Sequence, residues 1–546
     1  MPEALPEELP EGYYLENFEY LLNFVVDRYD HLLKEEEKAY RRLFFSLNDE
    51  AKKLYVRLSN RKGPYFRTDK LNYPEAGELP ATVDLLSASG LVETVLPDWS
   101  ESVALCTRDE LQRIDVVSDL PRSTSRRALL EVIGDQNVNP VAELNIPVIE
   151  LGGLDHLMVY RLLFFGNFHQ DMTEFVLHKL VSPFESYDLS PDASAFQSRA
   201  IVDSVIELKC LSELSLEAIE NDETGDQLLQ LASRIPERPD EPMLARRYDR
   251  MINRLARQLE RLDVPERALD LYALARSTPA RERRSRILDK LGQPEASLEL
   301  CEAIHAAPLN EEEKEFAVFF GRRLSRKHSL VTDLPEHGKV KPNQQCICIA
   351  KTAAQVEMCA AEYYNGLGRT CFYVENTLFR GIFGLAFWDI IFAPVPGAFF
   401  HPFQRGPADL HTPDFVRSRS TLIDARLAEL AQPVRLREQV MQTWQQKNGI
   451  ANQFVNWTWL TVELLELALS QIPAAHHLQV FRRLLGDLKN NTSGLPDLIL
   501  FDDTGYELVE IKGPGDKIQK NQERWFRYFS DQGIPASLVN VEWTDP

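Results

Sequence analysis

Cysteines are few in this sequence, and their spacing is not that of a zinc finger. Seven occur among 546 residues, an odd number that excludes a fully paired disulfide framework and fits a chain whose thiols stay reduced. Cys346 and Cys348 are followed by Cys359 and Cys371. Because thiolates bind zinc, one interpretation of this set is a zinc site. Buried thiols are the interpretation that we favour.

The sequence also lacks a hydrophobic run suited to export or membrane insertion. The N-terminus, MPEALPEELPEGYY, is acidic and has neither the basic nor the apolar part of a signal peptide. The most apolar window, residues 381–400, contains Asp389 and two prolines. We predict that it is a buried helix ending near Pro394. We therefore expect a cytoplasmic protein with no membrane partner.

The sequence also has few basic residues relative to acidic ones. Asp and Glu outnumber Lys and Arg by 83 to 61, which gives a formal net charge of −22. Since binding to polyanions depends on Lys and Arg, this excludes a surface that attracts nucleic acid everywhere. Any such contact must come from local basic clusters. With 44% hydrophobic residues, the chain can bury large cores, and we expect three or four domains.

The most informative stretch is residues 494–522, GLPDLILFDDTGYELVEIKGPGDKIQKNQ. Two apolar runs flank an Asp-Asp-Thr-Gly turn, which predicts a β-hairpin whose first strand begins with Asp497. Side chains alternate along a strand, so Glu510 and Lys512 should lie on one face. The pattern predicts three polar groups converging beside one hairpin. The alternative is an ordinary hairpin whose acids face solvent.

This set of groups suits metal-assisted hydrolysis of a phosphodiester. Clustered carboxylates repel one another, and a divalent cation with oxygen ligands, Mg²⁺ or Mn²⁺, relieves the repulsion. Such an ion stabilises the charge that builds on the phosphate and lowers the pKa of the attacking water. A nearby lysine can orient that water. The residues therefore favour a nuclease.

The context of the hairpin resembles a known family. Pro496 before Asp497, the Gly-Pro-Gly loop at 513–515 after Lys512, and Gln522 in a following helix resemble the PD-(D/E)XK nucleases, and more narrowly the VRR-NUC domain of the Fanconi-associated nuclease family. The resemblance implies the following roles: Asp497 and Glu510 as metal ligands, the carbonyl of Ile511 as a further ligand, Lys512 near the attacking water, and Gln522, or alternatively Gln519, supporting the site.

A further carboxylate is expected, because two-metal chemistry needs more oxygen ligands than one Asp and one Glu provide. Glu375, at the start of the apolar helix in YVENTLFRGIFGLAFWDIIF, is our candidate, and the resemblance places an acid of the metal site there. Asp389, beside Trp388, is the rival. Its apolar surroundings favour a structural hydrogen bond instead.

Two basic clusters lie near the N-terminus. Residues 60–70, NRKGPYFRTDK, form a basic turn with aromatics that suits a DNA backbone or an exposed base; a solvated loop is the alternative. Residues 102–134 resemble a SAP module of two short helices, in which Ser123 or Thr124 caps the second helix and the arginines beside it hold a phosphate. The predicted DNA contacts are Arg57, Arg61, Lys62, Tyr65, Arg67, Lys70, Arg122, Arg126 and Arg127.

The middle of the chain contains an internal repeat. LERLDVPERALDLY at 259–272 matches LDKLGQPEASLELC at 288–301, with Pro265 and Pro294 spaced by 29 residues (294 − 265 = 29). The spacing is close to that of helical-hairpin repeats of the TPR type. We predict a multidomain, mostly α protein: a helical domain at 1–100 compatible with a winged helix, the SAP-like module at 101–135, a TPR-like domain at 136–335, and an α/β restriction-endonuclease-like VRR-NUC domain at 336–546.

The resemblance covers most of the chain and implies a partner and a role. The partner is branched DNA, such as a 5′ flap or a nicked or gapped duplex, cut a few nucleotides into the duplex on the 5′ side, with 5′–3′ exonuclease activity and a role in interstrand crosslink repair. A monomer, nucleoid-associated when bound to DNA, is expected. The ubiquitin-binding zinc finger of eukaryotic members has no Cys/His counterpart here. The alternative hypotheses are a Holliday-junction-type resolvase, which needs a symmetric dimer, and a non-catalytic scaffold.

Overall fold

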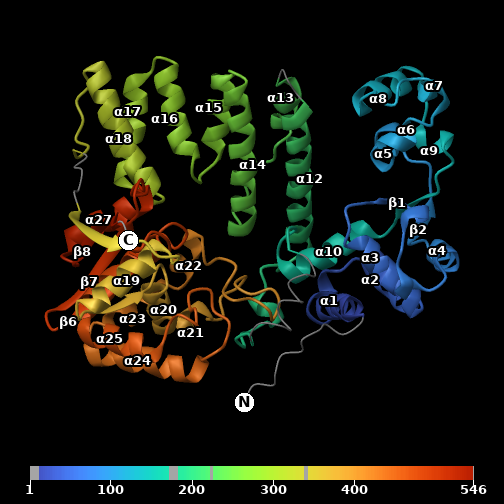
Figure 1. Cartoon of the computed structure of the whole chain (residues 1–546). Helices are drawn as coiled ribbons and strands as arrows, with labels where there is room; N and C mark the ends of the chain where they lie inside the picture. Colours follow the sequence, from blue (N-terminus) through green and yellow to red (C-terminus); the bar gives the residue numbers. More distant parts are fainter. Residues whose placement is uncertain (1–11, 171–182, 222–224, 337–341, 545–546) are drawn as a thin grey trace. The chain divides into compact units, whose positions relative to one another are not determined.

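The computed structural model describes residues 12–170, 183–221, 225–336 and 342–544. The chain forms two compact units (Figure 1). The first comprises Met1–Ser182 with Leu189–Arg199, and the second Pro183–Asp188 with Ala200–Pro546. Among the described residues, no helix combines the length and the apolar character that a membrane span requires.

The first unit begins with a helical bundle. Asn48 caps the third helix, because its side chain accepts a hydrogen bond from Ala51 N–H at 3.0 Å. Phe24 of the first helix packs on Phe164, with ring centroids 5.1 Å apart. The helices are α1 (Tyr13–Tyr29), α2 (Glu35–Ser46), α3 (Asp49–Ser59), α4 (Leu79–Ala88) and α10 (Leu154–Phe165), with short 3₁₀ turns at Asp30–Leu32, Thr68–Lys70, Pro74–Ala76 and Pro191–Ala193.

A three-stranded antiparallel sheet accompanies these helices. Its order is β1 (Tyr65–Arg67), β3 (Val148–Leu151), β2 (Val92–Thr94). The central strand β3 lies beyond the SAP-like segment, so residues 148–165 belong with the N-terminal helices. The sequence-based range 136–335 places these residues with the repeat helices instead. The difference arises because strand pairing over such a sequence separation leaves no local signal.

The SAP-like segment is inserted between β2 and β3 and contains five short helices, where we predicted two. They surround an apolar core that includes Leu111, Leu129 and Ile133. The cap of α8 is Ser125, whose hydroxyl accepts from Ala128 N–H at 3.3 Å; our prediction of Ser123 or Thr124 was wrong by one or two residues. The helices are α5 (Trp99–Leu105), α6 (Arg108–Leu111), α7 (Asp115–Ser118), α8 (Arg126–Asp135) and α9 (Pro140–Glu143).

The second unit starts with a row of helices. The two copies of the internal repeat occupy equivalent positions, because Pro265 begins α15 and Pro294 begins α17, where the missing proline N–H has no intrahelical partner to lose. Consecutive helices pack as antiparallel neighbours (Figure 1). They are α12 (Arg199–Asn221), α13 (Asp226–Ala232), α14 (Pro242–Arg261), α15 (Pro265–Leu274), α16 (Ala280–Lys290), α17 (Pro294–Ala306) and α18 (Glu311–His328).

The C-terminal part of this unit is built on a five-stranded mixed sheet, as predicted for the nuclease domain. The strand order is β4 (Asn343–Ala350), β8 (Ala536–Thr544), β7 (Gly505–Lys512), β6 (Leu498–Asp502), β5 (Thr370–Tyr373). The predicted hairpin is confirmed: β6 and β7 pair antiparallel, with Asp502 opposite Gly505. Helix α19 (Val356–Gly366) covers one face, where Ala360 and Tyr364 pack on apolar residues of the sheet.

Further helices enclose the sheet. The apolar window is buried as expected, but it forms two helices, α20 (Leu378–Ala386) and α21 (Trp388–Ile391), and ends three residues before Pro394. Of the four clustered cysteines, Cys359 and Cys371 are buried, whereas Cys346 and Cys348 on edge strand β4 are exposed. The remaining helices are α22 (Pro413–Ser418), α23 (Ser420–Glu429), α24 (Pro433–Lys447), α25 (Val462–Gln471), α26 (Ala474–Gly486) and α27 (Lys520–Gln532).

Candidate nuclease site

The hairpin brings Asp497, Glu510 and Lys512 together. Asp497 directly precedes β6, and its Oδ2 accepts a hydrogen bond from Ile511 N–H on β7 at 2.9 Å. Glu510 and Lys512 share a face of β7, as predicted, and Lys512 Nζ donates to Glu510 Oε1 at 2.7 Å. The three residues are only 8%, 1% and 9% exposed. The alternative of an ordinary hairpin with solvent-facing acids is therefore wrong.

Glu510 is incompletely satisfied. Gln522 at the start of α27 donates its side-chain amide to Oε1, the oxygen that Lys512 also contacts. The other oxygen, Oε2, is buried and has no hydrogen-bond partner. Gln519 instead caps α27, and its backbone N–H donates to Gln522 Oε1 at 2.9 Å. Of the two glutamines considered, Gln522 is thus the one bonded to Glu510.

Both buried carboxyls resist ionisation. Burial raises the pKa of Asp497, and the carboxylates of Glu357 and Glu375 raise it further, against the Ile511 N–H and Lys512. Burial and then the charge of Asp497 raise the pKa of Glu510, against Lys512. Like charges in a poorly solvated site have this effect, and an added cation reverses it. Even with Lys512 nearby, the two carboxyl groups therefore have too little positive charge around them for both to ionise readily.

Glu375 lies beside this pair, in the loop between β5 and α20 rather than at the start of the helix. The backbone N–H groups of Val374 and Glu375 both donate to the carbonyl oxygen of Asp497, at 2.7 and 3.2 Å. The Tyr373 hydroxyl donates to the Glu375 carboxylate. The loop is therefore fixed against Asp497.

The rival acid, Asp389, is elsewhere. It is exposed and forms a two-point ion pair with Arg426, at 3.0 and 2.8 Å. The structural hydrogen bond that we expected for it in apolar surroundings is thus a surface ion pair. Between the two candidates, Glu375 is the one near the hairpin.

Sequence reasoning missed Glu357. This residue lies in the first turn of α19 and is half-buried. The neighbouring Val356 is close to Gly513, directly after Lys512, since a Cβ on Gly513 would lie 3.8 Å from Val356 Cγ1. The charge of Glu357 raises the pKa of Asp497 more than that of Glu375 does. The sequence signal that could have identified Glu357 is an acidic residue in the first turn of the helix that follows β4.

The donor set fits a divalent cation that prefers oxygen. Asp497 and Glu510 offer carboxylate oxygens, one of them an orphaned buried atom, and hard cations such as Mg²⁺ take such ligands. Within the described ranges, no three His, Cys, Asp or Glu side chains are already arranged around one point. The Glu375 carboxylate, held by Tyr373, would have to turn to join the other two.

The predicted basic turn of the first unit is mostly neutralised. Arg67 is buried, and its guanidinium forms ion pairs with Asp69 at 2.6 Å and Glu110 at 2.8 Å. Lys70 also contacts Glu110, at 2.9 Å. Here the structure differs from the exposed basic loop that we expected, because Asp69 of the loop itself and Glu110 of α6 neutralise it. The DNA contacts stay predictions.

The other predicted DNA contacts near the basic turn make different interactions. Arg57 pairs with Glu75 at 2.9 Å, and Arg61 donates to the Tyr73 hydroxyl at 3.0 Å. Tyr65 packs against the core of the SAP-like segment. Lys62 is exposed.

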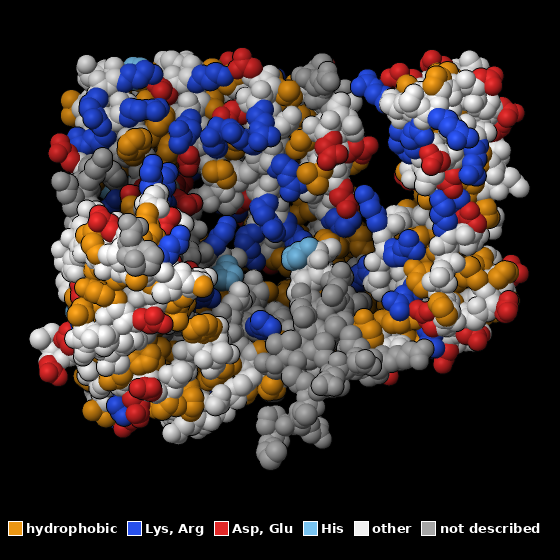
Figure 2. Space-filling view, viewed as in Figure 1, with side chains coloured by type: hydrophobic (Ala, Val, Ile, Leu, Met, Phe, Trp, Pro, Cys, Tyr) orange, Lys and Arg blue, Asp and Glu red, His pale blue; other side chains and the backbone are white. Residues whose placement is uncertain are grey.

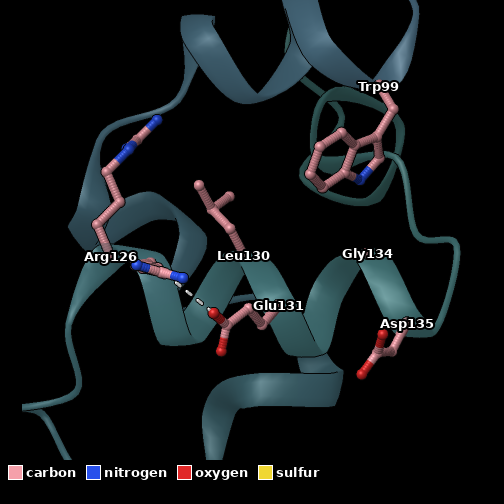
Figure 3. Close-up of a pocket in the computed structure, with 7 residues that line it drawn as sticks. Trp99, Arg126, Leu130, Glu131, Gly134 and Asp135 are labelled. Atoms are coloured by element: carbon pink, nitrogen blue, oxygen red, sulfur yellow. Dashed lines mark hydrogen bonds and ion pairs between the residues drawn. The ribbon is translucent and has the colours of Figure 1, made fainter. Parts of the chain in front are cut away.

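The arginines of the SAP-like segment also divide. Arg126 donates to the carbonyls of Cys106 and Val103 at 2.8 and 2.7 Å, which ties α8 to α5. Arg127 is highly exposed and pairs with Glu131 on the next turn, at 3.1 Å. Arg122 is exposed in the link before α8. Figure 3 shows Arg126, Trp99 and Glu131, which line a pocket of this segment together with Arg127.

Lys and Arg side chains are also frequent over the repeat helices α14–α18 in Figure 2. Several of them are paired with acids. Arg281 contacts Glu313 at 2.6 Å, and Arg286 contacts Glu282 at 2.9 Å.

Comparison with known proteins agrees with this geometry. The family model described as "VRR-NUC domain" matches residues 431–543, and the one described as "FAN1, HTH domain" matches residues 12–93. The first range includes the hairpin but begins after Glu357 and Glu375. A VRR-NUC domain implies a divalent metal.

Relatives match along nearly the whole chain. The chain is 34% identical over 559 residues to a Fanconi-associated nuclease 1 homolog of Pseudomonas aeruginosa, covering 99% of this chain and 97% of the relative. It is 25% identical over 638 residues to human Fanconi-associated nuclease 1, covering 97% of this chain and 62% of that protein.

A solved structure is similar over the same extent. The crystal structure of paFAN1 bound to 2nt 5′ flap DNA with gap matches with a TM-score of 0.83 and 33% identity, over 99% of this chain and 100% of that one. A second crystal structure of paFAN1, with a 1nt 5′ flap, matches with a TM-score of 0.81 and the same identity. On this evidence, the chain belongs to the Fanconi-associated nuclease family.

Proposed function

We propose that this nuclease uses Mg²⁺ or Mn²⁺ to cut one strand of branched DNA close to a 5′ flap. The observation that carries the proposal is the buried set of Asp497, Glu510 and Lys512, in which one carboxylate oxygen of Glu510 has no partner. Retaining such an oxygen costs stability unless a ligand binds there. A 5′–3′ exonuclease activity and a role in interstrand crosslink repair belong to the same proposal.

The metal would be held by Asp497, Glu510 and the carbonyl of Ile511, with Glu375 as a further ligand. The Ile511 N–H is directed at Asp497, and the N–H and C=O of one strand residue point to the same edge, which supports the carbonyl as a ligand. When bound, the ion supplies charge stabilisation to the phosphate and lowers the pKa of the attacking water.

The protein's own groups then have separate tasks. Lys512 holds the Glu510 carboxylate through Oε1, and its ammonium lies where it can orient the attacking water or offset phosphate charge. Gln522 fixes the same oxygen from the other side. The Tyr373 hydroxyl sets the direction of Glu375.

The choice of substrate rests on the solved relatives, which are crystal structures of paFAN1 bound to 5′ flap DNA with a gap. Similarity over the full length supports the same class of substrate for this chain. Lys62 and Arg122, together with Arg127, whose partner is the exposed Glu131, are exposed cations of the first unit and the better placed of our predicted DNA contacts. Arg61 and Lys70 are exposed but bonded to Tyr73 and Glu110, and Arg57, Tyr65, Arg67 and Arg126 are engaged within the fold.

The test is cleavage of an end-labelled 5′ flap with Mg²⁺, Mn²⁺ or chelator, using wild type, Asp497→Asn and Asp503→Asn. Asp503 is exposed in the turn of the same hairpin, so its variant is matched in charge and location. We expect metal-dependent incision by wild type and Asp503→Asn, and none by Asp497→Asn. Equal cleavage by Asp497→Asn would refute the site assignment.

Two further outcomes separate the alternatives. Preference for a four-way junction with paired symmetric cuts would favour a resolvase. Tight flap binding without cleavage under either metal would favour a scaffold.

A further inference from the structure

An exposed tryptophan lies one aromatic ring away from the candidate metal site. Trp459 is 49% exposed, and its ring packs edge-on against Tyr373, with centroids 5.8 Å apart and an interplanar angle of 70°. The Tyr373 hydroxyl donates to the carboxylate of Glu375. The indole is thus connected to a proposed metal ligand through a single side chain.

The loop before α25 is built to hold this side chain outward. The Asn456 side chain accepts hydrogen bonds from the N–H groups of Thr458 and Trp459, at 3.1 and 3.4 Å. Leu460 is buried against α20, where a Cβ on Gly381 would come within 2.6 Å of it. The preceding Trp457 donates its indole N–H to the Ile450 carbonyl at 2.8 Å. The neighbours are anchored, so exposure of Trp459 is a fixed property of the loop.

The chemistry of this loop points to a nucleobase rather than a phosphate. Residues 456–462, NWTWLTV, contain no Lys or Arg, and the groups that link Trp459 to the site are the Tyr373 hydroxyl and the Glu375 carboxylate. The loop itself therefore offers no positive charge to a phosphate, and the guanidinium of Arg380 on the adjacent α20 is engaged with the Gln453 carbonyl at 3.2 Å. A neutral aromatic base, in contrast, can stack on an indole, and such stacking requires that the base be unpaired or at the end of a duplex.

We propose that Trp459 stacks on an unpaired base of the strand that is cut, and so sets which phosphate reaches the metal site. This inference rests on the proposed function, since it assumes that the hairpin site receives DNA. It adds a substrate-positioning residue that acts through the base rather than through the backbone.

The first experiment measures stacking without catalysis. In the Asp497→Asn background, 2-aminopurine is placed in turn at each position around the junction of a 5′ flap, and its fluorescence is recorded with and without Trp459→Ala. We expect quenching at one or two adjacent positions, restored by Trp459→Ala and partly kept by Trp459→Phe. Phe319→Ala, which removes an aromatic ring that is 59% exposed on α18, should leave the quenching unchanged.

The second experiment is a double-mutant cycle for binding. Trp459→Ala should weaken flap binding about ten-fold, as should an abasic site at the quenched position, and the two changes together should weaken it no further. Additive effects, or fluorescence that never depends on Trp459, would overturn the proposal.

A purely structural role, transmitted through Tyr373 to Glu375, predicts a different result. In that case Trp459→Ala in the active enzyme would lower kcat and raise the metal requirement, as Tyr373→Phe would, with KM and the incision position unchanged. The stacking proposal predicts a higher KM and a shifted or scattered incision position. Because the binding arms need no cleavage, they remain decisive even if the flap is not the substrate that is cut.

Discussion

Two regions of this molecule differ in whether their buried charges are balanced by the chain itself. Around Arg67 in the first unit, Asp69 and Glu110 neutralise the buried guanidinium. In the hairpin site, Asp497, Glu510, Glu357 and Glu375 influence one another, and Lys512 is the cation that contacts Glu510. The first cluster is balanced by the chain itself, whereas the second has an excess of negative charge. The comparison teaches that a balanced cluster serves folding, and an unbalanced buried one is prepared for a ligand of opposite charge.

The largest expected effect comes from removing charge at the unbalanced site. Glu510→Gln should reduce the rate of flap cleavage by about a thousand-fold or more, because it removes a metal ligand whose charge supports the transition state. Its thermal stability in the absence of metal should equal or exceed that of wild type, since burial makes the charged form unfavourable. Cleavage assays and thermal unfolding of Glu510→Gln measure the two effects, with the exposed Glu523→Gln on α27 as the control. A large loss of stability would show that Glu510 is balanced after all.

Metal binding should offset the excess negative charge at the hairpin site and so stabilise the folded protein. At a free Mg²⁺ or Mn²⁺ concentration about 100 times Kd, binding to the folded state alone adds about 3 kcal/mol of stability. We expect the melting temperature of the second unit to rise by several degrees, and the rise to disappear in Asp497→Asn. Calorimetry with and without chelator measures this shift. An equal shift in Asp497→Asn would place the ion elsewhere.

At the balanced cluster, substitution should affect folding and leave chemistry intact. Burial by itself raises the pKa of Glu110, but the hydrogen bonds from Arg67, Thr107 and Lys70 outweigh it and hold the pKa below its usual value. The pairing therefore stabilises the fold above the unfolded pKa of about 4.3 and is lost as the pH falls through the lower folded value. Glu110→Gln should lower stability by about 1–3 kcal/mol at pH 7.

The pH dependence gives the control for this prediction. The difference in melting temperature between wild type and Glu110→Gln should narrow as the pH is lowered below about 4. The cleavage rate per folded molecule at pH 7 should be unchanged. A difference that is the same at every pH would mean that the carboxylate charge of Glu110 does not contribute.

The smallest effect is expected for a single exposed cation. Lys62→Ala should weaken flap binding about two- to three-fold and reduce the salt dependence of binding by about one phosphate contact. Arg67→Met should instead reduce stability, with the affinity of the folded protein unchanged. Binding titrations at several salt concentrations, with unfolding measured in parallel, compare the two. Weaker binding by a fully stable Arg67→Met would contradict the contrast between the two regions.

The sequence-based prediction of the hairpin rested on local patterns. The turn residues, the alternation that puts Glu510 and Lys512 on one face, and the helix bearing Gln522 are all contained within 29 residues, 494–522, and all appear in the fold. Glu375 was also found, because the resemblance marks its position. The helical repeat was visible for the same reason, since its signal is a short period.

Non-local contacts account for what sequence analysis did not find. Arg67 and Glu110 are 43 residues apart, so the sequence of the basic turn, which itself contains Asp69, does not show that Glu110 also pairs with Arg67. Glu357 and Trp459 acquire their relevance from a helix that packs on the sheet and a loop that packs on Tyr373. Strand β3 was misassigned because its partners precede it by more than fifty residues. Each of these depends on which distant segments pack together.

The place of the SAP-like segment in the first sheet has a consequence for modularity. Strands β2 and β3 are antiparallel neighbours with Thr94 opposite Ile149, and Val95 N–H donates to the Val148 carbonyl at 3.1 Å. The segment between them therefore leaves and re-enters the sheet at adjacent points, as a hairpin loop does. Topologically it is an enlarged turn. Its length can therefore change without altering the order of the strands, provided that the partner of Arg67, Glu110, is kept.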